Sequence, residues 1–206
     1  MTHLSWICDG FPSLIDTPFG EYGIDCAFDS EGNEAYIFST KLCAHVNYGP
    51  GSTTDDKILS GPITIAAMFP VLKNTVFENG IDSVFRSTRG KEIYLFKGNK
   101  YGRITYHSKK LVGTIRKITD AIFENGIDAC FASHNENQAY LFKGEKYVRI
   151  IYRPCTDDDD ALVGDVRHIL NGWPSLKGIL PLDNKGVDAH SHTDHQQPYP
   201  DQHDEL

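Results

Sequence analysis

The chain has 206 residues, 40% of them hydrophobic and 23% charged, which is the balance of a soluble globular protein. Its formal net charge of −8 at pH 7 argues against a nucleic-acid partner, because phosphate contacts need a basic face, and is compatible with cationic partners. No stretch is long and apolar enough to span a bilayer, so no membrane partner is expected. Ten tyrosines and eleven phenylalanines favour strands over helices.

The five cysteines are odd in number and form no CxxC pair, which is not the pattern of a secreted disulfide scaffold. We expect reduced, mostly buried thiols at these positions. Residues 1–14 show no positive start followed by an apolar run, so the sequence predicts no signal peptide and a cytosolic location. The alternative is the endoplasmic reticulum lumen, because the last four residues, His203-Asp204-Glu205-Leu206, spell a retrieval signal that acts on proteins that entered by a leader.

The chain opens with an aromatic-proline step at Phe11-Pro12 that no strand pattern precedes. The same step recurs at Phe69-Pro70 and at Trp173-Pro174, each time after a strand-rich segment, so we interpret it as the closer of a repeat unit. Phe11-Pro12 is then the remnant of a first unit, and the repeats together cover residues 1–183.

The first complete unit covers residues 15–72. Its first strand, Ile24–Phe28, is followed by a hairpin that joins residues 35–38 to residues 43–46. The hydroxyl and carboxylate groups of residues 54–56, Thr-Asp-Asp, are typical helix caps, so a helical stretch is predicted directly after them.

Two further units cover residues 73–118 and 119–182. They share the segment Phe-Glu-Asn-Gly-Ile-Asp, which ends at Asp82 and at Asp128, and a Tyr-Leu-Phe-Lys-Gly-x-Lys-Tyr hairpin. Asp25 and Asp82 stand 57 positions apart, whereas Asp82 and Asp128 stand only 46 apart. The second unit is therefore about eleven residues short, and the part that it lacks is the aromatic-proline closer.

Each unit amounts to a sheet of three or four short antiparallel strands, which cannot bury its apolar face alone. Neighbouring units must therefore pack face to face in a ring, with the first strand of each unit along the axis. These axial strands are Ile24–Phe28, Ile81–Phe85 and Ile127–Phe131. The sequence predicts an all-β protein, a β-propeller of about three blades.

The unit pattern Gly-Ile-Asp-x-x-Phe, followed by the Tyr-x-Phe-Lys-Gly-x-x-Tyr hairpin and the Phe-Pro closer, resembles the hemopexin repeat. Segments such as Arg86–Glu92 and Trp173–Leu176 resemble the legume seed albumin-2 family, and the resemblance covers about residues 5–183. It implies a four-bladed hemopexin-like β-propeller, here incomplete, with ions in a central channel. It also implies a cytosolic seed storage protein that forms homodimers and binds haem and a polyamine such as spermine.

The candidate metal ligands are the three aspartates that begin the axial strands, Asp25, Asp82 and Asp128. Rotation about the axis would bring their carboxylates or backbone carbonyls together, and oxygen ligands suit calcium. Alternatively, each aspartate only caps a turn after glycine through its own backbone. The residues favour neither interpretation, and the resemblance favours a calcium site.

Phe28, Phe85 and Phe131 recur three positions after these aspartates. Their rings could form the apolar wall of a site for a channel ligand, although packing between blades is the role that the residues favour. Haem binding would require an axial base, for which His45, His107 and His134 are candidates, and any of them could equally be a surface histidine.

Residues 184–206 are polar, proline-bearing and rich in histidine, which predicts a disordered tail. The run of aspartates at 157–160 is interpreted as the cap of a following helix rather than as a metal cluster. The sequence contains no motif of the main hydrolase, metalloprotease or nucleotide-binding classes, so no enzyme activity is predicted. The leading hypothesis is a non-enzymatic storage albumin that binds small ligands. The alternative is an interaction or dimerisation module without a physiological small ligand, because the missing blade leaves two unpaired blade faces.

Overall fold

The computed structural model describes residues 7–52, 54–156 and 161–178, which form three four-stranded antiparallel sheets. Sheet I consists of β1 (Cys26–Asp29), β2 (Glu34–Ser39), β3 (Leu42–Asn47) and β4 (Lys57–Thr64). Sheet II consists of β5 (Ser83–Arg86), β6 (Glu92–Lys97), β7 (Lys100–Thr105) and β8 (Lys110–Lys117). Sheet III consists of β9 (Ala129–Ala132), β10 (Gln138–Lys143), β11 (Lys146–Ile151) and β12 (Ala161–His168).

Short helical turns precede and connect the sheets. The α-helical turns are α1 (Ile7–Gly10), α2 (Pro18–Tyr22), α3 (Ile65–Met68) and α4 (Ile169–Gly172). The 3-10 turns are η1 (Pro12–Leu14), η2 (Pro70–Leu72), η3 (Val76–Asn79), η4 (Ala121–Phe123) and η5 (Pro174–Leu176). In the part of the chain that the structure describes, no helix is long and apolar enough to cross a membrane.

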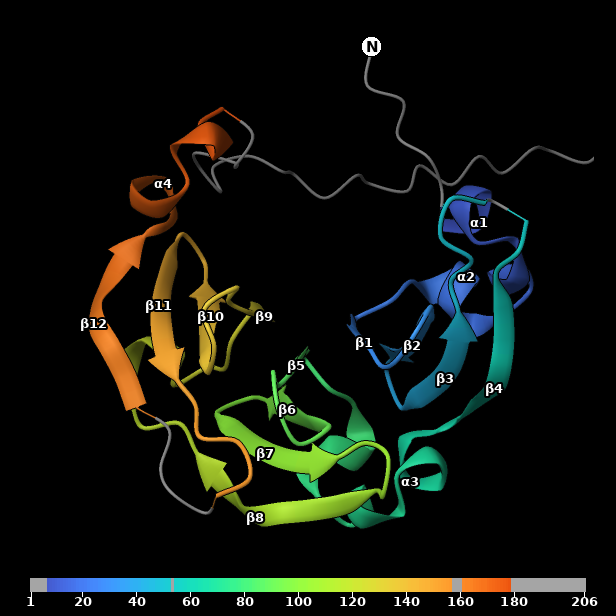
Figure 1. Cartoon of the computed structure of the whole chain (residues 1–206), viewed down its shortest axis with the longest axis horizontal. Helices are drawn as coiled ribbons and strands as arrows, with labels where there is room; N and C mark the ends of the chain where they lie inside the picture. The colour runs from blue at the N-terminus through green and yellow to red at the C-terminus, as the bar shows by residue number, and fades with distance from the viewer. Residues whose placement is uncertain (1–6, 53, 157–160, 179–206) are drawn as a thin grey trace, which may run out of the picture.

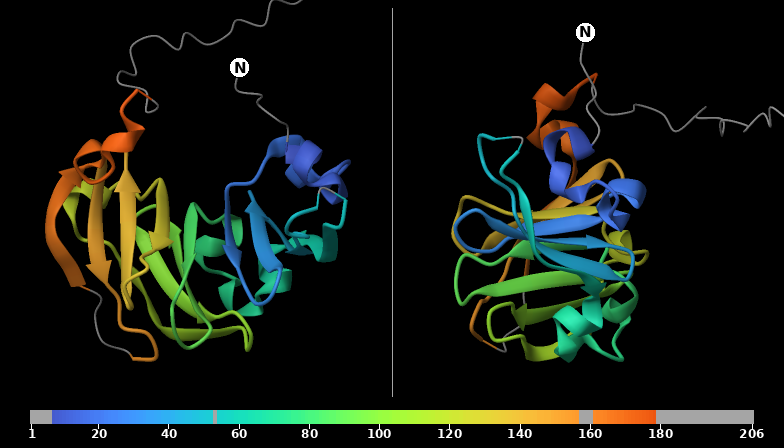
Figure 2. Two further views of the ribbon diagram at one scale, coloured as in Figure 1. Left: turned by 45° about the horizontal axis from the view of Figure 1, so that its top comes forward. Right: turned by 90° about the vertical axis from the view of Figure 1, so that its right-hand side faces the viewer.

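The three sheets stand around a common centre (Figure 1). In each sheet the strands pair in chain order, with the first strand innermost and the fourth outermost. β5 contacts both β1 and β9, so the three axial strands lie side by side. Among the described residues, no strand lies between sheet III and sheet I, and the ring is open there (Figures 1 and 2). The predicted β-propeller of three blades is confirmed.

Two helices predicted after capping residues are strands instead. Residues 54–56 lead into β4 and not into a helix, and the helical turn α3 comes only after that strand. The aspartates at 157–160 lie outside the described residues, but the segment that follows them is β12. Polar cap-type residues occur equally in the loop of a β-hairpin, and here the loop joins the third strand to the fourth. The predicted tail at 184–206 also lies outside the described residues.

Asp56, one of these cap-type residues, holds the start of the chain against sheet I. Its side chain is buried, and its Oδ2 accepts a hydrogen bond from the Ser13 backbone N–H at 2.9 Å and another from the Ser13 hydroxyl. A buried carboxylate needs such donors, because an unpaired charge in the interior is costly. Asp56 therefore fixes η1, the remnant closer, to the first complete blade.

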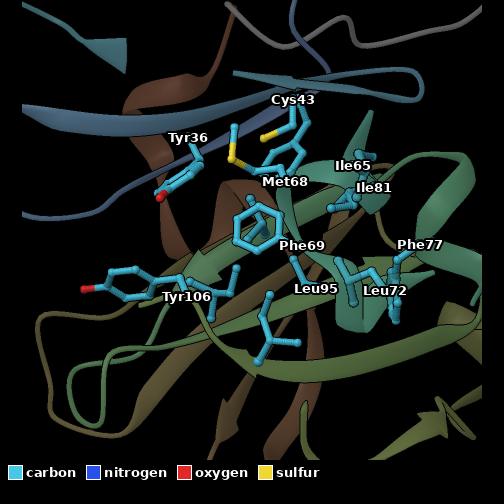
Figure 3. Close-up of a cluster of buried hydrophobic side chains, with 14 of the residues drawn as sticks. Tyr36, Cys43, Ile65, Met68, Phe69, Leu72, Phe77, Ile81, Leu95 and Tyr106 are labelled. Atoms are coloured by element: carbon cyan, nitrogen blue, oxygen red, sulfur yellow. The ribbon is translucent and has the colours of Figure 1, made fainter. Parts of the chain in front are cut away.

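The aromatic closers pack between blades. Phe69 has no exposed surface and belongs to the apolar cluster between sheets I and II (Figure 3). Its ring centroid lies 5.3 Å from that of Tyr36 and 6.3 Å from that of Phe38, both on β2. Phe11 occupies the same place in the remnant unit but is 39% exposed. Burial of the ring therefore depends on a neighbouring sheet.

Truncation of these two closers should have unequal effects on stability. We expect Phe69→Ala to lower the free energy of unfolding by about 3–5 kcal/mol, because it leaves a cavity between two sheets. Phe11→Ala, the matched control, should cost less than about 1 kcal/mol, since much of its ring is already in water. Urea denaturation monitored by circular dichroism measures both values. Equal losses would contradict the assigned role of the closer in packing the blades.

Candidate functional site

The axial strands enclose a cavity of about 300 Å³ at the centre of the ring. Three consecutive residues of each axial strand line it, at matching positions of the three sheets. They are Ala27, Phe28 and Asp29 of β1, Val84, Phe85 and Arg86 of β5, and Cys130, Phe131 and Ala132 of β9. The cavity is the feature to which all three repeats contribute alike, and we call it the channel cavity.

Two of the three predicted phenylalanines combine a channel position with packing between blades. The ring of Phe28 packs at a tilt against Tyr106 of sheet II, with centroids 5.5 Å apart, and that of Phe85 packs in the same way against Tyr152 of sheet III at 5.2 Å. Both are almost fully buried. Phe131 is 46% exposed, because no described blade supplies a tyrosine at the position that Tyr106 and Tyr152 hold beside Phe28 and Phe85. The three phenylalanines thus lie along one cavity, and Phe131 is the one with an accessible side chain.

The carboxylates of the predicted metal ligands are engaged inside their own sheets. Asp82 Oδ2 accepts a hydrogen bond from the Gly98 N–H, and Asp128 Oδ2 accepts one from the Gly144 N–H, each at 2.7 Å. Both glycines stand in the tight turn between the second and third strands, where they have positive φ angles of 53° and 54°. Each aspartate therefore holds the hairpin of its blade against the start of the axial strand.

Lysine side chains add an ion pair to two of these contacts between aspartate and hairpin, which we call the hairpin locks. Lys97 Nζ lies 2.5 Å from Asp82 Oδ1, and Lys143 Nζ lies 2.6 Å from Asp128 Oδ1. In sheet I the turn has threonine where the others have glycine, and Asp25 Oδ2 accepts a hydrogen bond from the backbone N–H of that residue at 2.6 Å.

These contacts bear on how calcium could bind. Within the described ranges there is no group of three or more His, Cys, Asp or Glu side chains placed to hold a metal ion. Since the carboxylates are occupied by hairpin donors, a cation at this end of the channel would need the backbone carbonyls, the other ligand set that the sequence suggested. Asp82 and Asp128 thus each accept a hydrogen bond from the turn of the hairpin through a side-chain oxygen.

Sulfur and hydroxyl groups line the contacts between axial strands. Cys26 Sγ donates to the Ile81 carbonyl at 3.4 Å, and Ser83 Oγ lies 2.9 Å from Cys130 Sγ. Burial raises the pKa of the Cys26 thiol well above its usual range. Burial also raises the pKa of Cys130 to about 12, although its hydrogen bond with Ser83 opposes this. Both thiols are therefore protonated at neutral pH and are weak nucleophiles and weak metal ligands. All five cysteines of the chain are free.

An ion pair that was not predicted from the sequence lies at the channel cavity. Arg86, at the end of β5, places Nη1 3.1 Å from Asp29 Oδ2 of β1 and also donates to the Ser30 carbonyl. Its guanidinium lies 5.8 Å from the centre of the Tyr106 ring. Their positions in the repeat could have predicted this pair. Asp29 and Arg86 directly follow the repeated phenylalanines, so they stand at matching sites on neighbouring strands.

The candidate haem ligands lie away from the channel cavity. His45 stacks on Tyr36 with a centroid separation of 4.3 Å, and its Nε2 is 2.9 Å from Glu34 Oε2. His107 and His45 both line a separate pocket of about 140 Å³ at the interface between sheets I and II. His134 is exposed in the loop that follows β9. None of the three is among the residues that line the channel cavity.

The lock at Asp128 should make the fold sensitive to acid. Burial opposes ionisation of this carboxyl, but the Gly144 hydrogen bond and Lys143 outweigh it and lower the pKa below its usual value. Because the pKa is lower in the folded than in the unfolded chain, the stabilisation is full above about pH 4 and is lost as pH falls through the folded pKa.

Asp128→Asn should therefore lower the melting temperature by roughly 1–3 °C at pH 7, and the difference from the unmodified protein should shrink below about pH 4. Thermal denaturation across pH 2.5 to 7 measures it. The control is Asp165→Asn, at an exposed aspartate of β12. A difference that stays constant through the acid range would refute the lock.

Comparison with known proteins agrees with this architecture. No protein-family model matches the chain. Albumin-2 of Pisum sativum is 51% identical over 183 residues, which cover 85% of this chain and 79% of the relative. A 2S albumin seed protein from Dolichos is 64% identical, with a TM-score of 0.76 over 88% of this chain and 83% of its own.

Two further solved structures are similar. A hemopexin-fold protein from cow pea is 59% identical, with a TM-score of 0.76 over 88% of this chain and 83% of its own. A plant lectin from Cicer arietinum, described as having two metal binding sites, is 53% identical, with a TM-score of 0.77 over 89% and 84% of the two chains. The chain therefore belongs to the albumin-2 family of legumes and has the hemopexin fold, with three blades in the part that the structure describes.

Proposed function

We propose that the protein is a non-enzymatic seed albumin that binds small ligands in the channel cavity. The observation that carries this proposal is convergence: matching residues of all three repeats line one cavity of about 300 Å³, which is within the usual size range of ligand sites. The thiol in its wall, Cys130, has a pKa of about 12 and is therefore a poor nucleophile. Such a site suits equilibrium binding rather than bond-breaking chemistry.

A cation is the first ligand class that we propose, with calcium as the leading candidate. The net charge of −8 attracts cations, and a relative is described as having two metal binding sites. The locks at Asp82 and Asp128 use their carboxylates, so the ligands would be backbone carbonyl oxygens at the start of the axial strands. Calcium accepts such ligands readily.

A polyamine such as spermine is the second ligand class. Its ammonium groups would lie against the exposed ring of Phe131 in the channel cavity, where cation–π contacts would hold them. Haem ranks last among the proposed ligands. The pocket beside His45 and His107, about 140 Å³, is below the size of about 300 Å³ at which typical ligand sites begin.

Calorimetry on metal-stripped protein tests the channel. We expect calcium to bind with measurable heat and, at about a hundred times its dissociation constant, to stabilise the fold by about 2.7 kcal/mol. Asp82→Asn should keep calcium binding, because the carboxylate is not a ligand. Phe131→Ala should weaken spermine binding and leave calcium binding unchanged. Absence of heat and of any melting shift with both ligands would refute binding in the channel.

Self-association is a second candidate function, favoured by the two open blade faces. On sheet III, Phe131 is exposed and packs beside Trp173. On sheet I, an apolar cavity of about 320 Å³ has Leu14, Ile37 and Val46 in its wall, beside Tyr48. A homodimer would cover such faces with those of a second copy.

Sedimentation velocity tests this candidate. We expect a dimer that Phe131→Asp converts to monomer, because a charge in an apolar interface is costly. Tyr22→Asp is the control, since Tyr22 is 72% exposed and is not among the residues that line the sheet I cavity. A monomer at all concentrations, or a dimer that survives Phe131→Asp, would contradict the proposed interface.

A further inference from the structure

The aromatic closers fill one particular place beside each sheet. In sheet I, the ring of Phe69 packs on Tyr36 and Phe38 of β2. In sheet III, the ring of Trp173 lies 5.3 Å from Tyr140 and 5.4 Å from Phe142 of β10. Tyr36 and Phe38 hold the positions in β2 that Tyr140 and Phe142 hold in β10. The aromatic ring of each closer thus packs against a tyrosine and a phenylalanine of the second strand.

Sheet II has the same tyrosine and phenylalanine but no closer. The backbone N–H of Ile65 donates to the Lys41 carbonyl, and that of Ile118 donates to the Asn99 carbonyl. The connections that follow sheets I and II therefore begin at matching points. Twelve positions then separate Ile65 from the buried Phe77, whereas five separate Ile118 from the buried Phe123. The shorter connection has no residue at the place of Phe69.

A cavity of about 140 Å³ lies at that place, between sheets II and III. Its walls are Tyr94, Phe96 and Tyr101 of sheet II and Leu141, Ile150 and Leu162 of sheet III. Residues 117–120, the shortened connection, form its rim. Tyr94 is held in place by a stacked contact with Phe85 at 4.7 Å and by a tilted contact with Tyr152 at 5.1 Å, so the aromatic wall is fixed. We call this space the inter-blade cavity.

We propose that the inter-blade cavity is a ligand site for a single aromatic ring, which would lie where Phe69 and Trp173 lie in the other two sheets. An apolar cavity of about 150 Å³ is known to stay dry and to accept benzene, so the size suits one ring. Tyr94 and Phe96 form the aromatic wall that the ring would contact, at centroid separations of about 4.5–7 Å.

The rim adds a preference for one small polar substituent. Lys117 is exposed, and its ammonium can meet a hydroxyl or carboxylate on the ring. Asp120 already accepts the Ile122 N–H through Oδ1 at 3.0 Å, as the cap of η4. The ligand class is therefore a phenol or a small aromatic acid. None of the residues that line this cavity lines the channel cavity, so binding here is independent of the proposed channel ligands.

Ligand-observed saturation-transfer NMR with phenol as the probe tests the site. We expect saturable binding of phenol to the unmodified protein, and no change when calcium and spermine are present. Leu162→Trp places a bulky ring in the wall and should weaken phenol binding at least tenfold. Leu111→Trp is the matched control. Leu111 pairs with Ile104 in sheet II as Leu162 pairs with Ile150 in sheet III, but it belongs to the interface between sheets I and II. It should bind phenol normally.

One loop-length variant and one truncation sharpen the test. Replacing residues 119–122 by residues 66–76 restores the closer to sheet II and should abolish phenol binding while raising the melting temperature. Phe69→Ala, examined at a temperature where it stays folded, should gain a second phenol site. Absence of saturable binding to the unmodified protein would overturn the proposal, and so would normal binding by Leu162→Trp.

Discussion

Every sheet of this protein depends on a neighbour to cover its apolar face, and aromatic rings make the contact. A phenylalanine on the axial strand of one blade packs against a tyrosine that directly follows the third strand of the next, as Phe28 does against Tyr106 and Phe85 against Tyr152. The contact repeats because the units repeat, and it ends where the blades end. Phe131 shows the consequence, since the same ring without a described neighbour is 46% exposed.

The axial aspartates illustrate how repetition can suggest a site that packing explains. A residue that recurs at the head of each axial strand is expected near the axis, and a ligand shared by three carboxylates is a natural interpretation. In the structure, Asp82 and Asp128 instead hold the hairpin of their own blades, with Gly98 and Gly144 as donors. A repeated residue therefore shows that each blade makes the same internal contact, and a site shared between blades needs separate evidence from the geometry.

Much of the fold was predictable because the repeat is long and well marked. The three sheets and the inner place of the axial strands followed from the period and from the hairpin signals. The fourth strands, β4 and β12, were not predicted, because their start resembles a helix cap and only pairing with the third strand distinguishes the two. The Asp29–Arg86 pair was missed for a related reason: its partners are 57 positions apart and meet only when blades pack.

The missing closer of the second unit links the sequence to the inter-blade cavity. A cavity left in a single globular core closes in part, to the extent that the surrounding side chains can move inward. Here the two walls belong to different sheets, and the spacing of those sheets is set elsewhere, by contacts such as Phe85 on Tyr152 and Ser83 with Cys130. The walls at Tyr94 and Leu141 are therefore held apart although the ring between them is gone. A shortened connection in a rigid repeat array can create a pocket, where the same change in a compact core would only be repacked.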